Sequence, residues 1–317
     1  MGLGSSVARV DKGAQRRSQR SSRAERLGNT RFALLMLTPA AIIVGLTLVY
    51  PLGFSFWTSL NKVSPVDLSM QFVGLSNYVA STRLAFFSTA VGNTIYFAVV
   101  TIAGTVVLGL GIALVLNEPF IGRGVLRTLV IVPWALSQVV VGIIWGWIYN
   151  GSFGVLNAAL KGAGLIQTYQ GWLSDPSRTM NLVALVFIWS TVPFAAVMYL
   201  ASLQTIPEDL YKAARVDGAG VVQRFLHITL PALRYTTLVV LIVASVDGLL
   251  AFTLIWVMTG GGPGTATTLL SWLGYQTTFV SLDLGTGAAV FYLLVFLLLA
   301  ITIIYVRVLH RPVEEVV

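Results

Sequence analysis

A single acidic residue lies within a long apolar stretch in the last third of the chain. Asp247 is the only Asp, Glu, Lys, Arg or His between Arg234 and Asp283. A charged side chain at the centre of a bilayer costs about 2.5–3.5 kcal/mol on insertion scales, so it should face protein or water rather than lipid. A carboxylate accepts hydrogen bonds from hydroxyl groups. Asp247 therefore predicts either a binding site for a polyhydroxy solute or a structural hydrogen bond to a neighbouring helix.

The residues that other chemistries require are absent from the sequence. There is no cysteine, which excludes disulfides, thiolate zinc sites and cysteine nucleophiles. The two histidines, His227 and His310, lie near predicted helix ends, and they predict no metal site. The apolar runs contain no paired carboxylates or histidine clusters, and no Gly-x-x-x-x-Gly-Lys-Ser/Thr segment occurs. We therefore do not expect an enzyme, and the chain cannot hydrolyse ATP by the P-loop route.

The elements that must position Asp247 are helices in lipid. Of the 317 residues, 56% are hydrophobic and 10% are charged, whereas about a quarter of the residues of a soluble domain are charged. A helix needs about 20 apolar residues to cross roughly 30 Å of hydrocarbon. The sequence thus predicts an all-α membrane protein whose transmembrane domain covers residues 32–310. Six spans are expected, at 32–56, 88–116, 126–148, 182–203, 233–258 and 284–308.

The basic residues predict the orientation of these spans. Residues 1–31 hold eight of the 20 Lys and Arg residues and few apolar ones, so we expect a disordered cytoplasmic tail. With both termini inside, eight further Lys and Arg residues lie on or near the cytoplasmic side, and four lie outside. This bias follows the positive-inside rule and makes residues 311–317 a second cytoplasmic tail. The net charge of +8 then indicates topology, with possible contact to lipid headgroups, and no nucleic-acid binding.

The connection at residues 205–231, between the fourth and fifth spans, contains residue types that predict its local structure. Thr205 is expected to cap a helix that has Pro207 in its first turn and two acidic residues at its positive dipole end. Gly218 and Gly220 allow a sharp bend, and a second short helix follows. The predicted structure is a helix–turn–helix bracket at the cytoplasmic face. Local chemistry alone is also compatible with a simple connector.

This connection resembles the EAA loop of ABC importer permeases, particularly those of the maltose type. The matching residues are Pro207, Leu210, Ala213, Ala214, Asp217, Gly218, Ala219, Phe225, Ile228, Leu230 and Pro231. In that family a short coupling helix inserts into a groove of the nucleotide-binding subunit. The resemblance implies that the residues coupling this chain to an ATPase are Glu208, Asp209, Lys212, Ala213, Ala214, Asp217 and Gly218.

One residue departs from the family pattern. Lys212 stands where the family usually has the glutamate of Glu-Ala-Ala. Either Glu208 or Asp209 then replaces that carboxylate, or the partner ATPase presents an acidic residue to Lys212.

The resemblance extends over most of the chain from about residue 32. Supporting motifs are Asn93-Thr94, Val132-Pro133-Trp134, Trp189 with Pro193-Phe194, Thr259-Gly-Gly-Gly-Pro263, and Tyr275 with Phe279 and Gly285. It implies the six-span bundle of a type I ABC importer permease with a cytoplasmic coupling helix. Aligning the motifs carries the family's sugar contacts to Trp134, Gln138, Ser190, Thr191, Phe194, Asp247, Gly248 and Ala251. Small Gly248 and Ala251 would widen the site or shift contacts to a partner permease.

The resemblance also implies the function and the partners. The expected protein is the permease of an ATP-driven importer that moves a sugar (oligosaccharide, monosaccharide or polyol) across the cytoplasmic membrane of a prokaryote by alternating access. It would assemble with a second permease subunit, two ATPase subunits that bind ATP and Mg, and an extracytoplasmic binding protein, and would itself hold no cofactor. The alternatives are a permease for glycerol phosphate or another small polar solute, and an ion-coupled secondary transporter. The last alternative predicts buried charge relays and broken spans, and Asp247 is the one buried charge expected.

Overall fold

The first compact unit of the chain is helical. A computed structural model describes residue 32 and residues 34–309, and the chain divides into two units after Trp57. A continuous helix covers Leu34–Ser59, with a π-helical turn at η1 (Gly45–Val49) and α2 (Tyr50–Ser59) at its end. Its 26 residues correspond to about 39 Å, which is long enough to cross a bilayer.

A small hairpin opens the second unit. Strands β1 (Asn61–Val63) and β2 (Met70–Phe72) pair antiparallel with Lys62 opposite Gln71, and α3 (Ser76–Thr82) follows. Buried Asn77 of α3 donates from Nδ2 to the carbonyl oxygens of Ser59 and Asn61, at 2.9 Å each, and so fixes the hairpin. These strands are the only β-structure in the described part of an otherwise helical chain.

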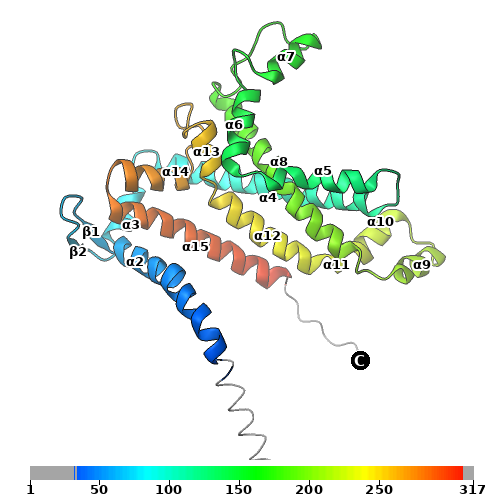
Figure 1. The fold of residues 1–317 in the computed structure, drawn as a ribbon, viewed down its shortest axis with the longest axis horizontal. Helices are drawn as coiled ribbons and strands as arrows, with labels where there is room; N and C mark the ends of the chain where they lie inside the picture. Colours follow the sequence, from blue (N-terminus) through cyan, green and yellow to red (C-terminus); the bar gives the residue numbers. More distant parts are fainter. Residues whose placement is uncertain (1–31, 33, 310–317) are drawn as a thin grey trace, which may run out of the picture. The chain divides into compact units, whose positions relative to one another are not determined.

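The rest of the second unit consists of helices joined by turns and by two longer loops, between α7 and α8 and between α13 and α14 (Figure 1). They are α4 (Phe87–Asn117), α5 (Arg123–Ala135), α6 (Gln138–Ile148), α7 (Val155–Gly162), α8 (Pro176–Leu203), α9 (Glu208–Val216), α10 (Val221–Arg224), η2 (Phe225–Thr229), α11 (Leu230–Ala232), α12 (Arg234–Leu249), α13 (Thr253–Met258), α14 (Leu270–Tyr275), η3 (Gln276–Val280) and α15 (Leu284–Leu309).

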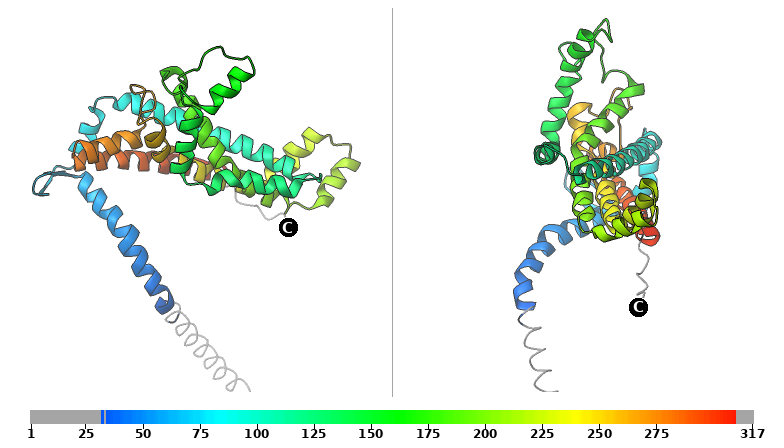
Figure 2. Two further views of the ribbon diagram at one scale, coloured as in Figure 1. Left: turned by 45° about the horizontal axis from the view of Figure 1, so that its top comes forward. Right: turned by 90° about the vertical axis from the view of Figure 1, so that its right-hand side faces the viewer.

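Helices α4 and α8 form the centre of the packing, α12 lies against both, and α15 packs beside α12 (Figures 1 and 2). Two glycines of α4 allow the close approach. A Cβ on Gly109 would lie 2.5 Å from the Cβ of Ala195, and one on Gly104 would meet the side chain of Ile188. Small residues at such contacts let helix backbones pack closely, which is how helices associate in lipid.

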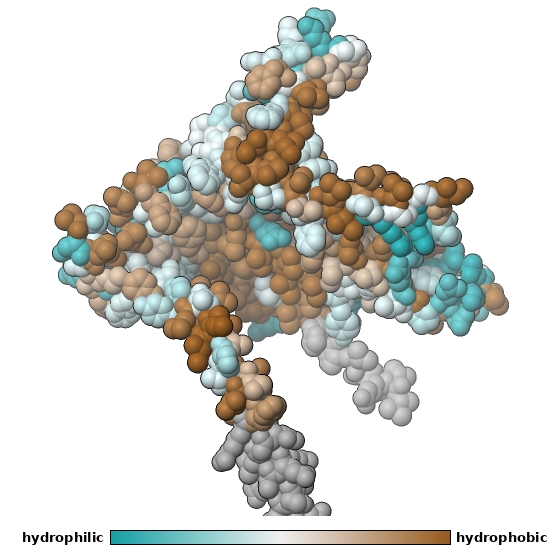
Figure 3. Space-filling model, in the orientation of Figure 1, coloured by the Kyte–Doolittle hydropathy of each residue, from teal (hydrophilic) through white to brown (hydrophobic). Residues whose placement is uncertain are grey.

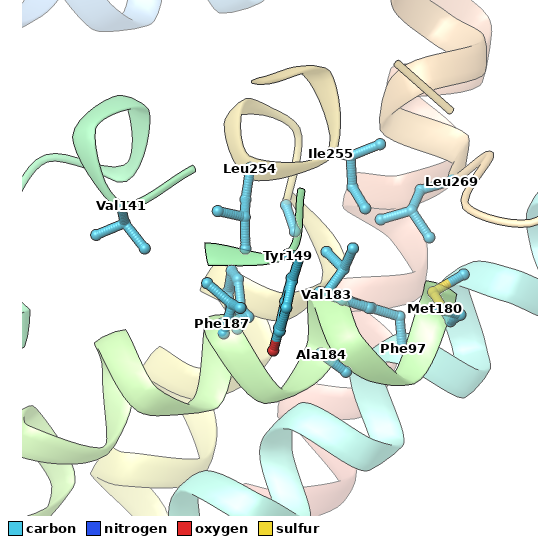
Figure 4. Packing of buried hydrophobic residues seen from close by; sticks show 12 residues of the cluster. Phe97, Val141, Tyr149, Met180, Val183, Ala184, Phe187, Leu254, Ile255 and Leu269 are labelled. Carbon is cyan, nitrogen blue, oxygen red and sulfur yellow. The ribbon is translucent and has the colours of Figure 1, made fainter. Parts of the chain in front are cut away.

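The largest buried cluster joins α4, α6, α8 and α13 (Figure 4). Phe97 of α4 meets Phe187 of α8 edge-on, with ring centroids 5.3 Å apart. Tyr149, which follows α6, lies beside them and is 3% exposed. This cluster holds the end of α6 and the short helix α13 against the central pair.

Among the described residues, four helices are long and apolar enough to cross a membrane, and the number rises to six if each of two bent pairs is counted as one span. The expected span at 126–148 is broken: α5 and α6 meet at 99°. The expected span at 233–258 is also interrupted, because α12 ends at Leu249 and α13 starts at Thr253. Helical structure precedes that span from Val221, with a 67° bend before α12. Hydrophilic residues gather at the α9–α10 end, and the helical surfaces are largely hydrophobic (Figure 3).

Candidate functional site

An open cavity of about 540 Å³ lies among α5, α6, α8, α12 and α13. Its lining mixes aromatic, aliphatic, hydroxyl, amide and carboxylate groups. The lining residues are Trp134, Leu136, Ser137, Gln138, Phe187, Ser190, Thr191, Val246, Asp247, Leu250, Ala251, Phe252, Thr253 and Leu254. A concave site with a few polar groups on apolar walls is the usual form of a small-molecule site.

The α5–α6 break forms one border of this cavity. Pro133 lies inside α5, where it removes a backbone donor and clashes with the preceding turn, and α5 ends two residues later. Ser137 then starts α6, since its Oγ accepts from the backbone N–H of Val140 at 3.4 Å. The extended backbone at Leu136 thus ends α5, and Ser137 begins α6 beside the cavity.

The α12–α13 break forms a second border. Residues 250–252 are not helical, which frees backbone groups that a helix would pair. Ser271 of α14 donates from its Oγ to the carbonyl oxygen of Ala251 at 2.5 Å, and so satisfies one of them. Irregular backbone at membrane depth is tolerated where it is buried in protein or lines a cavity.

Gln138 and Ser190 connect α6 to α8 at the cavity wall. The Ser190 hydroxyl donates its one proton to the carbonyl oxygen of Phe187 at 2.8 Å, so it accepts from Gln138 Nε2 at 3.2 Å. This assignment fixes the amide orientation of Gln138. Its Oε1 is buried and receives no hydrogen bond from the described residues. A buried acceptor in that state costs about 1–3 kcal/mol.

Thr191 lies one residue further along α8. Its Oγ1 is 2.9 Å from the Oγ1 of Thr105 on α4, and it also bonds the carbonyl oxygen of Phe187 at 3.0 Å. This polar contact ties the cavity wall to the central helix pair.

Asp247 faces the cavity from the last turn of α12. Its carboxylate makes no hydrogen bond or ion pair with the described residues, and its side chain is exposed in the isolated chain. The expected alternative, a structural hydrogen bond to a neighbouring helix, is therefore not present in this part of the chain. The carboxylate remains available to a solute or to water.

The structure brings six of the eight expected path residues to this one cavity: Trp134, Gln138, Ser190, Thr191, Asp247 and Ala251. Phe194 lies behind Trp134, with ring centroids 6.1 Å apart. Gly248 is buried and faces α4 instead, because a Cβ there would lie 2.9 Å from the Oγ1 of Thr101. Its small size serves helix packing and does not widen the cavity.

Sequence reasoning missed several lining residues. Phe187 precedes Ser190 by three positions, so helical periodicity alone was sufficient to place it on the same face. Phe252 and Thr253 line the cavity because the chain is broken before α13, and no proline or glycine at 250–252 signals that break.

The loop between α8 and α12 folds into two arms, which we call the bracket (residues 207–232). Glu208 and Asp209 occupy the first turn of α9, where they oppose the positive end of its dipole. The expected capping by Thr205 is wrong. Its Oγ1 donates back to the carbonyl oxygen of Ser202 at 2.8 Å, and Pro207 holds the N-cap position. Proline before α9 leaves no N–H to be satisfied there.

Gly218 makes the turn between the arms, as the sequence predicts. Its φ is +79°. The Gly218 N–H donates to the carbonyl oxygen of Arg215 at 3.1 Å, and the Ala219 N–H donates to that of Ala214 at 2.8 Å. This pair of bonds is a Schellman motif, which requires a left-handed residue after the helix. By contrast, Gly220 has φ −68° and precedes α10, so it does not share the bend.

Lys212 pairs with the acidic residues of its own helix. Its Nζ lies 3.0 Å from Asp209 Oδ1 and 3.7 Å from Glu208 Oε2, and all three side chains are largely exposed. The lysine and the two carboxylates therefore form one local charge cluster at the start of α9. Ala213, Ala214 and Asp217 follow it, and an open cleft of about 350 Å³ lies between the arms beside Asp217.

The histidines show no metal site. His227 Nδ1 lies 2.9 Å from the carbonyl oxygen of Gln223, within one helical turn. Among the described residues no group of three His, Cys, Asp or Glu side chains is placed to hold a metal ion. His310 and both tails lie outside the described residues.

These features define a class of protein. Helices of membrane-crossing length, together with an open cavity that has polar side chains at helix breaks, are the architecture of a solute permease.

Comparison with known proteins gives the family. Residues 105–314 match the family of binding-protein-dependent transport system inner membrane components, and the chain belongs to it. It is 38% identical over 90% of its length to the sulfoquinovosyl glycerol transport system permease protein SmoG of Agrobacterium fabrum, covering 92% of that protein. It is 39% identical over 88% of its length to the trehalose/maltose transport system permease protein MalF of Thermococcus litoralis, covering 93% of that protein.

A solved structure shows the same fold. The chain resembles a bacterial ABC transporter involved in the import of the acidic polysaccharide alginate, with a TM-score of 0.79 and 22% sequence identity. The match covers 92% of this chain and 99% of the other. The expected fold class, an all-helical ABC importer permease, is confirmed.

Family membership confirms the expected role as well. The chain is the multi-pass inner-membrane permease of an ABC importer, which works with a periplasmic binding protein and ATPase subunits. It is the membrane-spanning subunit and not the catalytic one. The two helix breaks had been expected for an ion-coupled transporter, and here they occur in an ABC permease.

Proposed function

We propose that this permease moves a neutral or weakly cationic sugar, either an oligosaccharide, a monosaccharide or a polyol, through the cavity beside Asp247. The single observation that carries the proposal is the unpaired Asp247 carboxylate in that cavity. A carboxylate is an acceptor, so it favours a ligand that donates hydrogen bonds from hydroxyl groups. An ionised carboxylate also repels an anion, which makes glycerol phosphate the weaker candidate.

The neighbouring groups support the same ligand chemistry. Gln138 Oε1 lacks a donor, and a hydroxyl group that reaches it would remove the cost of an unpaired acceptor. Trp134 is 57% exposed in the isolated chain and offers a flat apolar face to a sugar ring. The names of two relatives, which refer to trehalose, maltose and a sulfoquinovosyl glycerol, support a sugar as the solute class. The preference for a neutral or weakly cationic sugar rests on Asp247 alone, because a sulfoquinovosyl group is anionic.

A second permease subunit, homologous or identical to this chain, would cover the open side of the cavity. A polar cavity that contains Asp247 cannot face lipid without the cost of an intramembrane charge. We infer an assembly of two permeases, two ATPase subunits with their ATP and Mg, and one binding protein at the outer loops. Both termini would be cytoplasmic, as the Lys and Arg distribution indicates.

The bracket would dock on the ATPase through α9. The candidate contacts are Glu208, Asp209, Lys212, Ala213, Ala214, Asp217 and Gly218. Because Lys212 already pairs with Asp209, the three charged side chains at the start of α9 carry a net charge of −1, and Lys212 does not need an acidic residue on the ATPase. Closure of the two ATPases would then move the bracket and reorient the helices around the cavity.

Substitution of Asp247 tests the proposed site. The solute is first identified as the sugar that the cognate binding protein retains in a ligand screen, and its uptake is then measured in proteoliposomes. We expect Asp247→Ala to abolish uptake and Asp247→Asn to retain a fraction of it, because the amide keeps an acceptor oxygen without the charge. Complex assembly should be unchanged in both. Glu118→Gln, which removes a carboxylate from the turn after α4, is the matched control. Normal uptake by Asp247→Ala would refute the site.

A further inference from the structure

A hydroxyl pair joins the two arms of the bracket. The phenol oxygen of Tyr211 on α9 lies 2.9 Å from the Oγ1 of Thr229, the last residue of η2. Thr229 is 5% exposed, and Tyr211 is half-buried, whereas the neighbouring Leu210 and Lys212 are exposed. Among the described residues this is the one side-chain hydrogen bond between α9 and residues 221–232.

The backbone also joins the two arms. It passes through Gly218, which has no side chain and adopts a left-handed conformation. The Schellman bonds around it close the end of α9, but they do not reach residues 221–232. Glycine has the widest conformational freedom of any residue. Without a second attachment, α9 can change its angle to the other arm at this point.

The second arm leads directly to the cavity. Residues 221–232 continue into α12 across the 67° bend, and α12 carries Asp247 in its last turn. The π-helical turn η2 ends at Thr229, and such turns are frequent at functional positions in helices. A movement of this arm is therefore a movement of the base of α12.

We propose that Tyr211 is a positioning residue that fixes α9 to the base of α12 through Thr229. A displacement of α9 then turns α12 and is not absorbed by a change of backbone angles at Gly218. The inference rests on the proposed docking of α9 on the ATPase. It gives the two hydroxyl groups a role within this chain, which is to fix the angle between the two arms. Docking on the ATPase alone does not require that role. A residue that only contacted the ATPase would act on assembly and would leave the angle between the arms unchanged.

The cysteine-free sequence permits a direct test. Spin labels are placed at Val216→Cys on α9, a site that is 89% exposed, and at Val239→Cys on α12, which is 43% exposed. Electron–electron double resonance then gives the distance distribution between the labels, in the permease pair alone and in the complete transporter with Mg-ATP and vanadate. The parent should show one narrow distribution that nucleotide does not broaden, because α9 and α12 move together.

Removal of either hydroxyl group should uncouple the two helices. We expect Tyr211→Phe and Thr229→Val each to increase the width of the distance distribution at least about twofold. The double variant should be no broader than either single variant, and Thr229→Ser should have the same width as the parent. The matched controls are Tyr50→Phe, which removes a tyrosine hydroxyl outside the bracket, and Thr205→Val, whose hydroxyl bonds only Ser202. Both should behave as the parent.

Two results would overturn the assignment: a distribution as narrow in Tyr211→Phe as in the parent, or a Thr229→Ser variant as broad as Thr229→Val. Failure of the proposed docking gives a different result. In that case the label at residue 216 keeps the same mobility when the ATPase subunits are added. The comparison of parent and variants in the permease pair alone still decides the role of the hydroxyl pair.

Discussion

The contact between α6 and α13 gives a quantitative test of how the cavity wall is built. A Cβ on Gly142 of α6 would lie 2.8 Å from Val257 Cγ1 and 3.0 Å from Val257 Cβ. Carbon atoms in good contact are about 3.5–4.0 Å apart. A rotamer change cannot relieve the second contact, because the valine Cβ is fixed to the backbone. Gly142→Ala therefore has to push α13 away by about 0.5–1 Å.

The expected cost follows from the known effects of overpacking. Extra methyl groups in a packed core cost about 1–3 kcal/mol, and replacing glycine by alanine within a helix returns up to about 1 kcal/mol. Gly146, one turn further along α6, is the control, since a Cβ there meets nothing within 4 Å. Gly146→Ala should therefore gain only the stabilisation that alanine gives over glycine within a helix. The difference between the two alanine variants isolates the steric term, at about 1–3 kcal/mol.

Thermal inactivation of the detergent-solubilised transporter measures this difference. We expect Gly142→Ala to inactivate at a lower temperature than the parent, and Gly146→Ala at the same or a higher one. Uptake by Gly142→Ala should also fall at temperatures where the complex remains assembled, because the shift reaches Leu254 in the cavity wall. Equal inactivation temperatures for the two variants would refute the packing argument.

Two further predictions concern the ends of helices. Gly218→Ala places a side chain at φ +79°, which costs about 1–2 kcal/mol. ATP-driven uptake should therefore fall in this variant, whereas Gly220→Ala, at φ −68°, should change uptake little. Equal uptake by both variants would contradict the Schellman assignment. At the start of α8, hydrogen bonds from Ser177 and, less strongly, Arg178 hold the pKa of Asp175 below its ordinary value. Asp175→Asn should therefore lower thermal stability at neutral pH. The difference from the parent should shrink once the pH falls below the ordinary aspartate pKa of 3.8, and it should vanish where the pH falls through the lowered pKa of the folded protein and the carboxyl becomes protonated. A difference that persists in the protonated protein would contradict this origin.

The sequence was sufficient to predict the helices, but it did not predict the positions at which two of the spans are broken. Long apolar runs predict spans because an unpaired backbone is costly in lipid. Proline did not predict where they break. Pro133 precedes the end of α5 by two residues, whereas Pro193 lies inside the continuous helix α8. The difference is tertiary: α8 is packed on several sides, and α5 is followed by Ser137, which caps a new helix.

The second break had no local signal at all. Residues 250–252 are Leu-Ala-Phe, which any helix accepts, and the Ser271 hydroxyl that holds Ala251 is 20 positions away. Sequence reasoning placed Asp247 and Ser190 beside the cavity by alignment with a family pattern. The same alignment also selected Gly248, which instead faces Thr101 in the helix packing. A neighbouring position on a helix points about 100° away, so an alignment alone does not separate lining residues from packing residues.

The glycine-rich loop after α13 has a mechanical consequence. Asn93 of α4 donates from Nδ2 to the carbonyl oxygens of Thr265 and Thr268, at 2.9 and 3.0 Å, and Thr94 accepts from the N–H of Leu270. These three hydrogen bonds fix the loop to α4, although the loop is rich in glycine. The end of the cavity wall at α13 is then held in place, so a rotation of α12 has to be taken up at the non-helical residues 250–252 that separate α12 from α13.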